Sequence, residues 1–402
     1  MKILFLSFHE ILAPRLLLEI RTLLKEGHDV RVLAWNSSGK AWRYDFPVTF
    51  IHNQSRVSFE RSLKQGFFIT LRRIVGGLYP RTFKELLTRS WDVVHCNSLV
   101  VLPPAVLAKF FKGGKIIHDS YEFPSQTIPG RLKSTGLASL FRMVIEQTEK
   151  LLLSWVDAIL TIPSVGDGER QKFAKRCNLV EVLMNVPTLE GIVSKKSYAP
   201  PPTAIYTGAL SRDKGLYAML EATANLISSY PEFKLVLVGY MIENQAEMEE
   251  KIDNLGIRKN VVIHSWVSPD ELGDYISQAW VGLWPNQARE KFNRVTTGNS
   301  RKGFEYMKYG LPVVASSYGE IAKAVAEEQA GFLTDASNPE ALAQAVQKII
   351  ADPDLRQKMA ENGLKAVRNK YNWEKESAKL ITLYKALENQ ADTESRHRRS
   401  SK

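Results

Sequence analysis

Short apolar runs alternate with longer amphipathic runs along the chain. The apolar run at 2–7 (KILFLS) is followed by an amphipathic run that begins near Pro14 and ends at Gly27, and then by the apolar run at 28–35 (HDVRVLAW). An early proline and a final glycine are typical of helix boundaries, and short apolar runs are typical of buried strands. The pattern predicts a strand, a helix and a strand, and it favours a first strand over a signal peptide.

This rhythm recurs on both sides of a stretch with three consecutive prolines. Further strands are expected at 91–96, 115–120, 155–163 and 179–185, and then at 204–210, 233–239, 260–266, 279–285, 311–317 and 331–335. Strands that alternate with helices form parallel sheets covered by helices on both faces. The sequence therefore predicts an α/β fold of two Rossmann-like domains with parallel sheets facing a central cleft, where ligands bind at the carboxyl ends of the strands.

The same pattern sets the expected boundaries. The first domain is expected at 1–193, a linker at 194–203, where the prolines cannot continue a helix or a strand, and the second domain at 204–372. A C-terminal amphipathic helix at 373–389 is expected to pack back towards the first domain. Residues 390–402 contain no apolar residue larger than alanine and are expected to be a disordered tail.

Composition narrows the class of protein. Of the 402 residues, 44% are hydrophobic and 24% are charged, as in soluble globular proteins, and no apolar run is long enough to cross a membrane. Cys96 and Cys177 lie far apart in apolar segments, which fits reduced thiols in a cytoplasmic protein and offers no zinc site. The formal net charge of +11 suggests an anionic partner, although a basic surface without a specific partner explains it equally well.

Several familiar chemistries leave no motif in this sequence. It has no P-loop, no glycine-rich dinucleotide fingerprint after the first strand and no G-x-S-x-G elbow. These absences argue against an NTPase, a dehydrogenase and a hydrolase of those types. The pair Asp352 and Asp354 precedes a helical pattern and is expected to cap that helix rather than to bind a metal.

A single glutamate lies in the stretch SRKGFEYMKYGLPVVASS at 300–317. The pattern predicts a short helix, a Gly-Pro turn and a buried strand, with Glu305 among large apolar residues. Most glutamates are solvated helix residues, which is the ordinary alternative here. A carboxylate in partly apolar surroundings needs partners, however, so Glu305 is a candidate binding residue.

The motifs of the second half resemble those of a known enzyme family. The chain resembles the group 1 (family 4) glycosyltransferases of GT-B fold in three features. It has two Rossmann-like halves, the motif YTGALSRDKGL at 206–216, and the motif RKGFEYMKYGLPVVAS at 301–316 followed by GFLTD. The resemblance covers nearly the whole chain and is strongest in the second half. It implies transfer of a sugar from a nucleotide-sugar donor.

The resemblance also implies how the donor is bound. Lys214 of the K-G motif would contact the diphosphate, where fixed cations stabilise the charge of the leaving group. The arginine that the family usually has five residues earlier is Ala209 here, and Arg212 is a candidate substitute or, equally, a solvated loop charge.

Glu305 matches the second glutamate of the family's E-x7-E motif and would accept hydrogen bonds from both ribose hydroxyls. The first glutamate falls at Thr297, a departure that leaves the sugar contact to a small loop containing Gly298. Lys302 matches a basic position near the phosphates, with an exposed helix lysine as the alternative. The segment expected to hold the base comprises Ser265, Trp266 and Val267.

The first domain would hold the acceptor. KIIHDSYEF at 115–123 fits the family in two registers: His118 and Asp119 as its H-D pair, or Asp119 and Glu122 in its D-x-H-E loop with Tyr121 in place of the histidine. Both registers place Asp119 at a strand end, and His118 is alternatively a core histidine.

Two further basic residues are tied to the acceptor by the resemblance. His95 resembles a strand-end histidine of the family for which a structural role is expected. Arg15 lies at a helix start, where a cation is unfavourable unless it binds an anion, and this favours contact with phosphate or with an acidic acceptor.

The segment 56–89 interleaves basic and large apolar residues. It contains eight Lys or Arg residues and only two acidic residues, Glu60 and Glu85. This pattern is typical of a helix on an anionic membrane surface, and equally of a helix whose apolar face packs on a sheet. No nucleic-acid-binding module accompanies the charge.

The expected protein is therefore a cytoplasmic glycosyltransferase, alternatively peripheral on the inner face of the membrane. It would transfer a sugar to a glycan or lipid-linked acceptor, with retention because family 4 is retaining, and would need no cofactor and no metal for the diphosphate. Two alternatives stay open: a GT-B sugar-nucleotide epimerase, and a catalytically degenerate GT-B fold that acts as a binding or scaffolding module.

Overall fold

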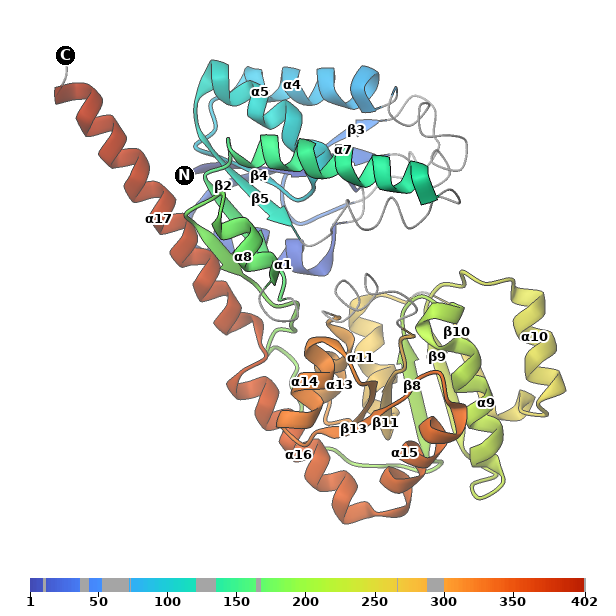
Figure 1. Cartoon of the computed structure of the whole chain (residues 1–402). Helices are drawn as coiled ribbons and strands as arrows, with labels where there is room; N and C mark the ends of the chain where they lie inside the picture. The colour runs from blue at the N-terminus through green and yellow to red at the C-terminus, as the bar shows by residue number, and fades with distance from the viewer. Residues whose placement is uncertain are drawn as a thin grey trace. The chain divides into compact units, whose positions relative to one another are not determined.

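The computed structural model describes residues 1–9, 12–36, 43–52, 72, 74–120, 135–163, 168–265, 267–287 and 300–400. The chain forms two compact units, which we call unit 1 (Met1–Leu183 with Glu376–Lys402) and unit 2 (Met184–Lys375). Each unit is built on one parallel sheet, of seven and six strands respectively (Figure 1). The predicted α/β fold with two Rossmann-like halves is confirmed.

The sheet of unit 1 has the strand order β3-β2-β1-β4-β5-β6-β7. Its strands are β1 (Lys2–Ser7), β2 (Asp29–Asn36), β3 (Val48–His52), β4 (Val93–Cys96), β5 (Lys115–Ser120), β6 (Ala158–Thr161) and β7 (Val180–Val182). The strand order reverses between β1 and β4, where Phe5 pairs with His95. Ligands of doubly wound sheets bind at the carboxyl ends of the strands beside such a switch point. The short edge strand β3 was not predicted.

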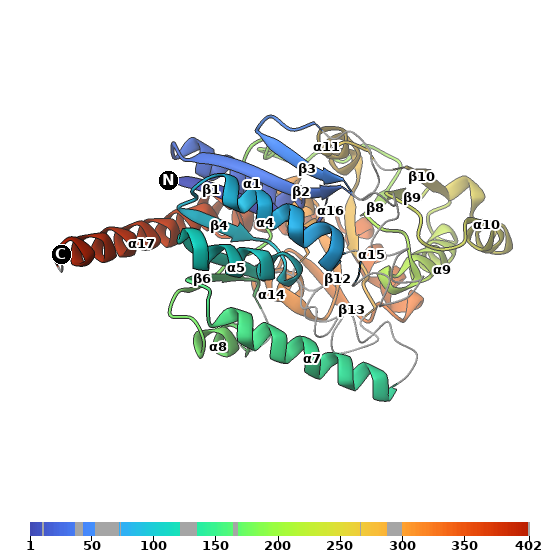
Figure 2. The ribbon, with the colours of Figure 1, turned by 90° about the horizontal axis from the view of Figure 1, so that it is seen from above.

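Helices cover both faces of this sheet. They are α1 (Pro14–Lys25), α4 (Tyr79–Thr88), α5 (Leu102–Lys112), α7 (Thr135–Leu153) and α8 (Gly168–Ala174), with the short turns η1 (Ile74–Leu78) and η2 (Leu99–Val101). From β3 through β6 the chain steps across the sheet in one direction, whereas α1 joins β1 to β2 in the other. Right-handed crossovers therefore place α4, α5 and α7 on one face and α1 on the opposite face. Figure 2 shows α4, α5 and α7 as neighbours.

The sheet of unit 2 has the strand order β10-β9-β8-β11-β12-β13. All six strands predicted in the second half are confirmed, as β8 (Thr203–Thr207), β9 (Lys234–Val238), β10 (Val261–His264), β11 (Val281–Trp284), β12 (Val313–Ser316) and β13 (Gly331–Thr334). Here the strand order reverses between β8 and β11. The carboxyl ends of these two strands are therefore the expected place for a ligand.

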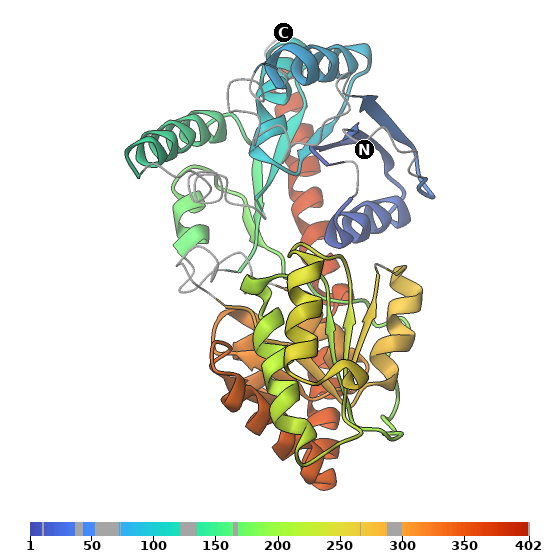
Figure 3. The same ribbon diagram turned by 90° about the vertical axis from the view of Figure 1, so that its right-hand side faces the viewer.

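The helices of unit 2 lie on both sides of its sheet (Figure 3). They are α9 (Leu216–Ile227), α10 (Gln245–Asn254), α11 (Pro269–Gln278), α13 (Lys302–Lys308), α14 (Gly319–Glu327), α15 (Pro339–Ala351) and α16 (Pro353–Asn369), with the turns η5 (Arg212–Lys214) and η6 (Arg258–Asn260). Asp352 caps α16, since its carboxylate accepts a hydrogen bond of 2.9 Å from the backbone of Leu355. The capping role predicted for the Asp352–Asp354 pair is thus confirmed for Asp352.

The proline-rich stretch belongs to unit 2 and is not the linker that the sequence suggested. Lys196 donates a hydrogen bond to the carbonyl of Ser277, and the ring of Tyr198 lies 5.7 Å from that of Trp280. Prolines prevent a regular element but do not prevent side chains beside them from packing. The chain instead passes from unit 1 to unit 2 between Leu183 and Met184.

The C-terminal helix is longer than predicted. Helix α17 runs over Trp373–Ser400, through the residues expected to form a disordered tail. No glycine or proline lies between 390 and 400, so nothing in that sequence interrupts a helix. The part from Glu376 onward groups with unit 1.

Two further observations concern the cysteines and membrane spans. Cys96 and Cys177 are both buried free thiols. Among the helices of the described residues, none combines the length and the apolar character of a membrane span.

Candidate active site

Two lysines meet at the carboxyl ends of the strands of unit 2, and we call Lys214 and Lys302 the lysine pair. Lys302 opens α13, and its side chain lies against Gly208, directly after β8. A Cβ atom at residue 208 would lie 2.2 Å from the Lys302 Nζ, and Gly208 has a φ of 123°. Only glycine leaves room for this ammonium group at the strand end.

Lys214 reaches the same strand ends through a tight turn. It closes the turn η5, and the next residue, Gly215, has a φ of 79° and precedes α9. A Cβ atom there would lie 2.2 Å from the carbonyl oxygen of Pro285, directly after β11. The glycine therefore lets the turn approach the switch point of the sheet, as the K-G motif suggested.

The lysine pair is a partly buried site of positive charge that Asp213 compensates only in part. Burial, assisted by the charge of Lys214 and opposed by that of Asp213, lowers the pKa of Lys302 to about 8. Burial likewise lowers the pKa of Lys214, against the smaller opposing effect of Asp213, whose carboxylate lies 3.9 Å away. Lys302 is mainly protonated at pH 7, so the pair attracts an anion with several negatively charged oxygens.

Arg212 is oriented differently from the lysine pair. Its guanidinium group lies 4.5 Å over the ring of Tyr217, and its backbone N–H donates to the carboxylate of Glu243 at 2.6 Å. The side chain is exposed. Lys302, rather than Arg212, is therefore the cation that the structure brings beside Lys214.

Glu305 has a protein partner on its own helix. The guanidinium of Arg301 donates to Oε1 of Glu305 at 2.5 Å, one turn earlier. The Glu305 side chain keeps 20% of its surface exposed. The carboxylate is thus oriented by a cation and remains accessible, which answers why a glutamate is tolerated among the buried residues Phe304 and Met307.

A polar residue that the sequence analysis overlooked lies beside β11. The side-chain oxygen Oδ1 of Asn286 is buried and, within the described part of the chain, has no hydrogen-bond partner. The hydroxyls of Ser316 and Tyr318 donate to its backbone carbonyl at 2.7 and 3.0 Å, which fixes the end of the strand. A polar residue directly after a buried strand was the signal available in the sequence.

Other donor residues from the sequence analysis lie partly outside the described residues. Ser265 and Val267 follow the end of β10, so they occupy a strand end as expected. Trp266, Thr297 and Gly298 lie outside the described residues.

Unit 1 contains a buried cluster of charged groups at its own switch point. We call Arg15, Glu19, His95, Asp119 and Tyr384 the ion cluster. The Arg15 guanidinium pairs with the carboxylates of Asp119 and Glu19, the latter at 2.9 Å. Nε2 of His95 lies 3.7 Å from Glu19 and 3.9 Å from Asp119, and its Nδ1 lies 2.8 Å from the Tyr384 hydroxyl.

Burial decides the protonation of the ion cluster. It raises the pKa of Glu19 to about 8, assisted by the charge of Asp119 and opposed by Arg15, and it raises the pKa of Asp119 as well. Burial also lowers the pKa of His95 well below its usual range, so its imidazole is neutral. One guanidinium thus faces two carboxyl groups, which share a proton near neutral pH.

This arrangement revises the role expected for Arg15. The anion expected beside this helix start is supplied by the protein itself, as two carboxylates, and the Arg15 side chain is only 5% exposed. His118 and Asp119 are consecutive in β5, so they point to opposite faces of the sheet. His118 is buried, which lowers its pKa to about 4. Tyr121 and Glu122 lie outside the described residues.

A metal ion is a poor occupant for the ion cluster. Ligand atoms of Glu19, His95 and Asp119 lie within 4.8 Å of one another. The guanidinium of Arg15 already supplies positive charge to both carboxylates, and it would repel a divalent cation held by the same groups.

The Tyr384 hydroxyl ties α17 to the ion cluster. Replacing Tyr384 by phenylalanine should leave the buried Nδ1 of His95 without its partner and lower the free energy of unfolding by about 1–3 kcal/mol. Chemical denaturation measures this loss. Tyr240→Phe is the matched control because Tyr240 is 57% exposed. Equal stability of both variants would contradict the assigned hydrogen bond.

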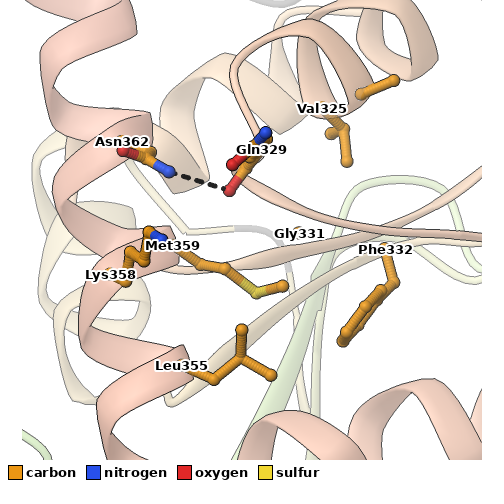
Figure 4. A pocket seen from close by; sticks show the side chains of 9 residues that line it. Val325, Gln329, Gly331, Phe332, Leu355, Lys358, Met359 and Asn362 are labelled. Atoms are coloured by element: carbon orange, nitrogen blue, oxygen red, sulfur yellow. Dashed lines mark hydrogen bonds between the residues drawn. The ribbon is translucent and has the colours of Figure 1, made fainter.

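A cavity of about 290 Å³ lies elsewhere in unit 2. Figure 4 shows its mostly apolar lining between α14, β13 and α16, where the amide of Asn362 donates to the carbonyl of Gln329 at 3.2 Å. Gly331, another lining residue, is the first residue of β13. The cavity therefore lies at the end of the sheet opposite to the lysine pair and is not part of that site.

Part of the chain matches a known protein family. Residues 191–366 match the family described as glycosyl transferases group 1. A D-inositol 3-phosphate glycosyltransferase of Corynebacterium urealyticum is 34% identical over 188 residues, which span 45% of this chain and 42% of that protein. An uncharacterized glycosyltransferase of Methanocaldococcus jannaschii, MJ1607, is 27% identical over 90% of this chain and 91% of its own length.

Solved structures share the fold of the whole chain. Sucrose-phosphate synthase from Thermosynechococcus elongatus superposes with a TM-score of 0.72 at 18% identity, over 97% of this chain and 100% of its own. Anabaena Alr3699/HepE in complex with UDP-glucose superposes with a TM-score of 0.69 at 17% identity, over 98% and 100%. The chain has the GT-B fold, and its residues 191–366 match the group 1 glycosyl transferase family.

Proposed function

We propose that this protein transfers a glycosyl group from a nucleotide-sugar to a glycan or lipid-linked acceptor, with retention of anomeric configuration. The lysine pair carries the proposal. Two ammonium groups at the strand ends beside the switch point of a doubly wound sheet, one of which lowers the pKa of the other, fit a donor diphosphate better than they fit any neutral ligand. Nucleotide-sugar binding by a protein of the same fold, Anabaena Alr3699/HepE in complex with UDP-glucose, supports this assignment.

The proposed reaction breaks the bond between the anomeric carbon and the diphosphate oxygen. The electron pair of that bond stays on the diphosphate, and the acceptor oxygen forms the new bond to the sugar and passes its proton to the departing diphosphate. Negative charge therefore grows on the leaving group in the transition state. Lys214 and Lys302 are held in place by Gly215 and Gly208, so they stabilise this charge without reorganisation.

The acceptor is assigned to unit 1 by the family resemblance. Asp119 lies at the carboxyl end of β5 but is buried and paired with Arg15. In this proposal, Arg15 and Glu19 fix the position of the Asp119 strand end, and His95 has the structural role expected from the sequence. A retaining transfer and a lipid-linked acceptor follow from the resemblance and are part of the proposal.

Glu305 provides a test of the donor site. Replacing Glu305 by glutamine keeps the shape but removes the charge of the acceptor, so donor affinity should fall by about 1.5–3 kcal/mol if a ribose hydroxyl binds there. Calorimetric titration with the nucleotide measures the change. Glu361→Gln is the control because this exposed glutamate lies on α16, away from the carboxyl ends of the strands where the lysine pair lies. Unchanged affinity in a folded Glu305→Gln protein would remove Glu305 from the site.

A nucleotide screen tests the function as a whole. Purified protein should unfold at a higher temperature with the nucleoside diphosphate that it recognises, because a ligand that binds only the folded state stabilises it by mass action. Consumption of the matching nucleotide-sugar should then require an acceptor. Consumption without any acceptor would indicate the epimerase. Binding without consumption, across a broad panel that includes lipid-linked sugars, would indicate the scaffolding module.

A further inference from the structure

Unit 1 exposes large apolar side chains on one layer of helices. Every strongly exposed large apolar residue described in this unit lies in or directly beside η1, α5 and α7. The exposed fractions are 48–68% for Leu107, Phe110, Phe111, Met143, Val144 and Leu151. The layer lies on the face of the sheet opposite to α1, so it is separate from the ion cluster.

Helical spacing and ring contacts connect several of these exposed residues. Leu140, Val144 and Leu151 recur at helical spacing along α7, and Trp155 follows two residues after its end. The ring of Phe110 lies 4.6 Å from that of Trp155, and the ring of Phe111 lies 5.9 Å from that of Phe83 on α4. These ring contacts join α4, α5 and the end of α7, which are neighbours in Figures 1 and 2.

The charges around this surface are mostly positive. On η1, α4, α5 and α7, the described exposed basic residues are Arg81, Lys84, Lys112 and Arg142, whereas the described exposed acidic residue is Glu85. The other acids are shielded: Glu149 is buried and pairs with Lys172 at 3.1 Å, and Glu146 is half-buried. Helices that expose large apolar side chains together with mainly basic residues suit the boundary between acyl chains and anionic headgroups.

We propose that the α4–α5–α7 layer docks on the surface of an anionic lipid bilayer. The apolar side chains of α5 and α7 enter the headgroup region, and Lys84, Lys112 and Arg142 contact lipid phosphates. A second copy of the chain fits less well, because a two-fold interface would bring the same cations of both copies together. The proposed membrane contact thus includes α5 and α7 in addition to η1 and α4, the described elements of segment 56–89. It does not depend on which sugar is transferred.

Vesicle co-sedimentation of the full-length protein tests the proposal. We expect binding to phosphatidylcholine vesicles that contain phosphatidylglycerol, weaker binding at high salt, and little binding to phosphatidylcholine alone. Lys112→Glu/Arg142→Glu should weaken binding by at least about tenfold, and so should Met143→Gln/Leu151→Gln. The matched control is Lys323→Glu/Lys365→Glu, which changes two exposed lysines of unit 2 by the same charge.

A site-specific probe makes the test independent of overall charge. Since Cys96 and Cys177 are buried, a cysteine introduced at Leu151 can be labelled selectively with an environment-sensitive fluorophore. Its emission should shift to the blue with anionic vesicles, whereas the same label at Lys323→Cys should not respond. Equal binding of all variants, or a silent label at Leu151→Cys, would overturn the proposal. So would oligomers formed without vesicles that Met143→Gln/Leu151→Gln dissociates, since they would assign the layer to a copy of the chain.

Discussion

Lys214→Ala is expected to lower kcat by on the order of a hundredfold or more while donor affinity falls less. The ammonium group acts mainly on the charge that develops on the leaving diphosphate, so its loss costs more in the transition state than in the ground state. Lys302→Ala should behave similarly, because its ammonium group lies against Gly208 at the same strand ends. Steady-state kinetics and calorimetric titration, run on the same preparations, separate the two effects.

Additivity distinguishes a shared site from two separate sites. If Lys214 and Lys302 act on one leaving group, the double variant should deviate from the sum of the single effects. Arg212→Ala is the control, because this exposed guanidinium stacks on Tyr217, and we expect a change in kcat of less than about threefold. A larger loss of kcat in Arg212→Ala than in Lys302→Ala would indicate that Arg212 replaces the arginine that the family has at the position of Ala209.

The pH dependence of donor binding gives a second readout of the lysine pair. Lys302 is protonated below its pKa of about 8 and neutral above it. Donor affinity of the wild type should therefore fall as the pH rises through this value, and the fall should be smaller in Lys302→Ala. A loss of affinity of equal size in both proteins would show that another group titrates.

Local patterns were sufficient to predict most elements of the fold. The six strands of unit 2 are apolar runs bounded by turns or helices, and α1 begins at Pro14 as expected. The position of the linker was wrong because its side chains find partners that are distant in sequence, such as Trp280 with Tyr198. The end of α17 was wrong because low hydrophobicity alone does not interrupt a helix.

The site was less predictable than the fold, since its properties arise from contacts between distant residues. The K-G motif indicated Lys214, but Lys302 becomes the second cation only because Gly208, 94 residues earlier, makes room for it. Arg15 was predicted to contact an anion of the acceptor, whereas it pairs with carboxylates of the protein itself. Its carboxylate partner Asp119 is separated from it by 104 residues, so no local pattern could reveal that the anion is internal.

The ion cluster should dominate the stability of unit 1. Arg15→Met removes the guanidinium that pairs with Glu19 and Asp119 and leaves both carboxyl groups buried. We expect a loss of about 3–5 kcal/mol at pH 8, because an uncompensated buried charge is costly. The control is Arg21→Met on the same helix: Arg21 and Asp45 are exposed and 3.2 Å apart, so this pair should contribute less than about 1 kcal/mol. Equal losses in the two variants would contradict the cluster.

The pH dependence of stability identifies the proton that the carboxyl groups share. In the folded protein Glu19 keeps its proton up to a pKa of about 8, whereas the unfolded chain releases it near the ordinary value of 4.5. Between these values the folded state binds more protons, so the contribution of Glu19 to stability is fully present below pH 4.5 and is lost as the pH rises towards 8. Glu19→Gln removes this titration and should flatten the dependence of the unfolding midpoint on pH over that window. Arg15→Met should steepen it, because Asp119 then also lacks its cation and takes up a proton in the folded state, and an unchanged slope in both variants would assign the proton to another group.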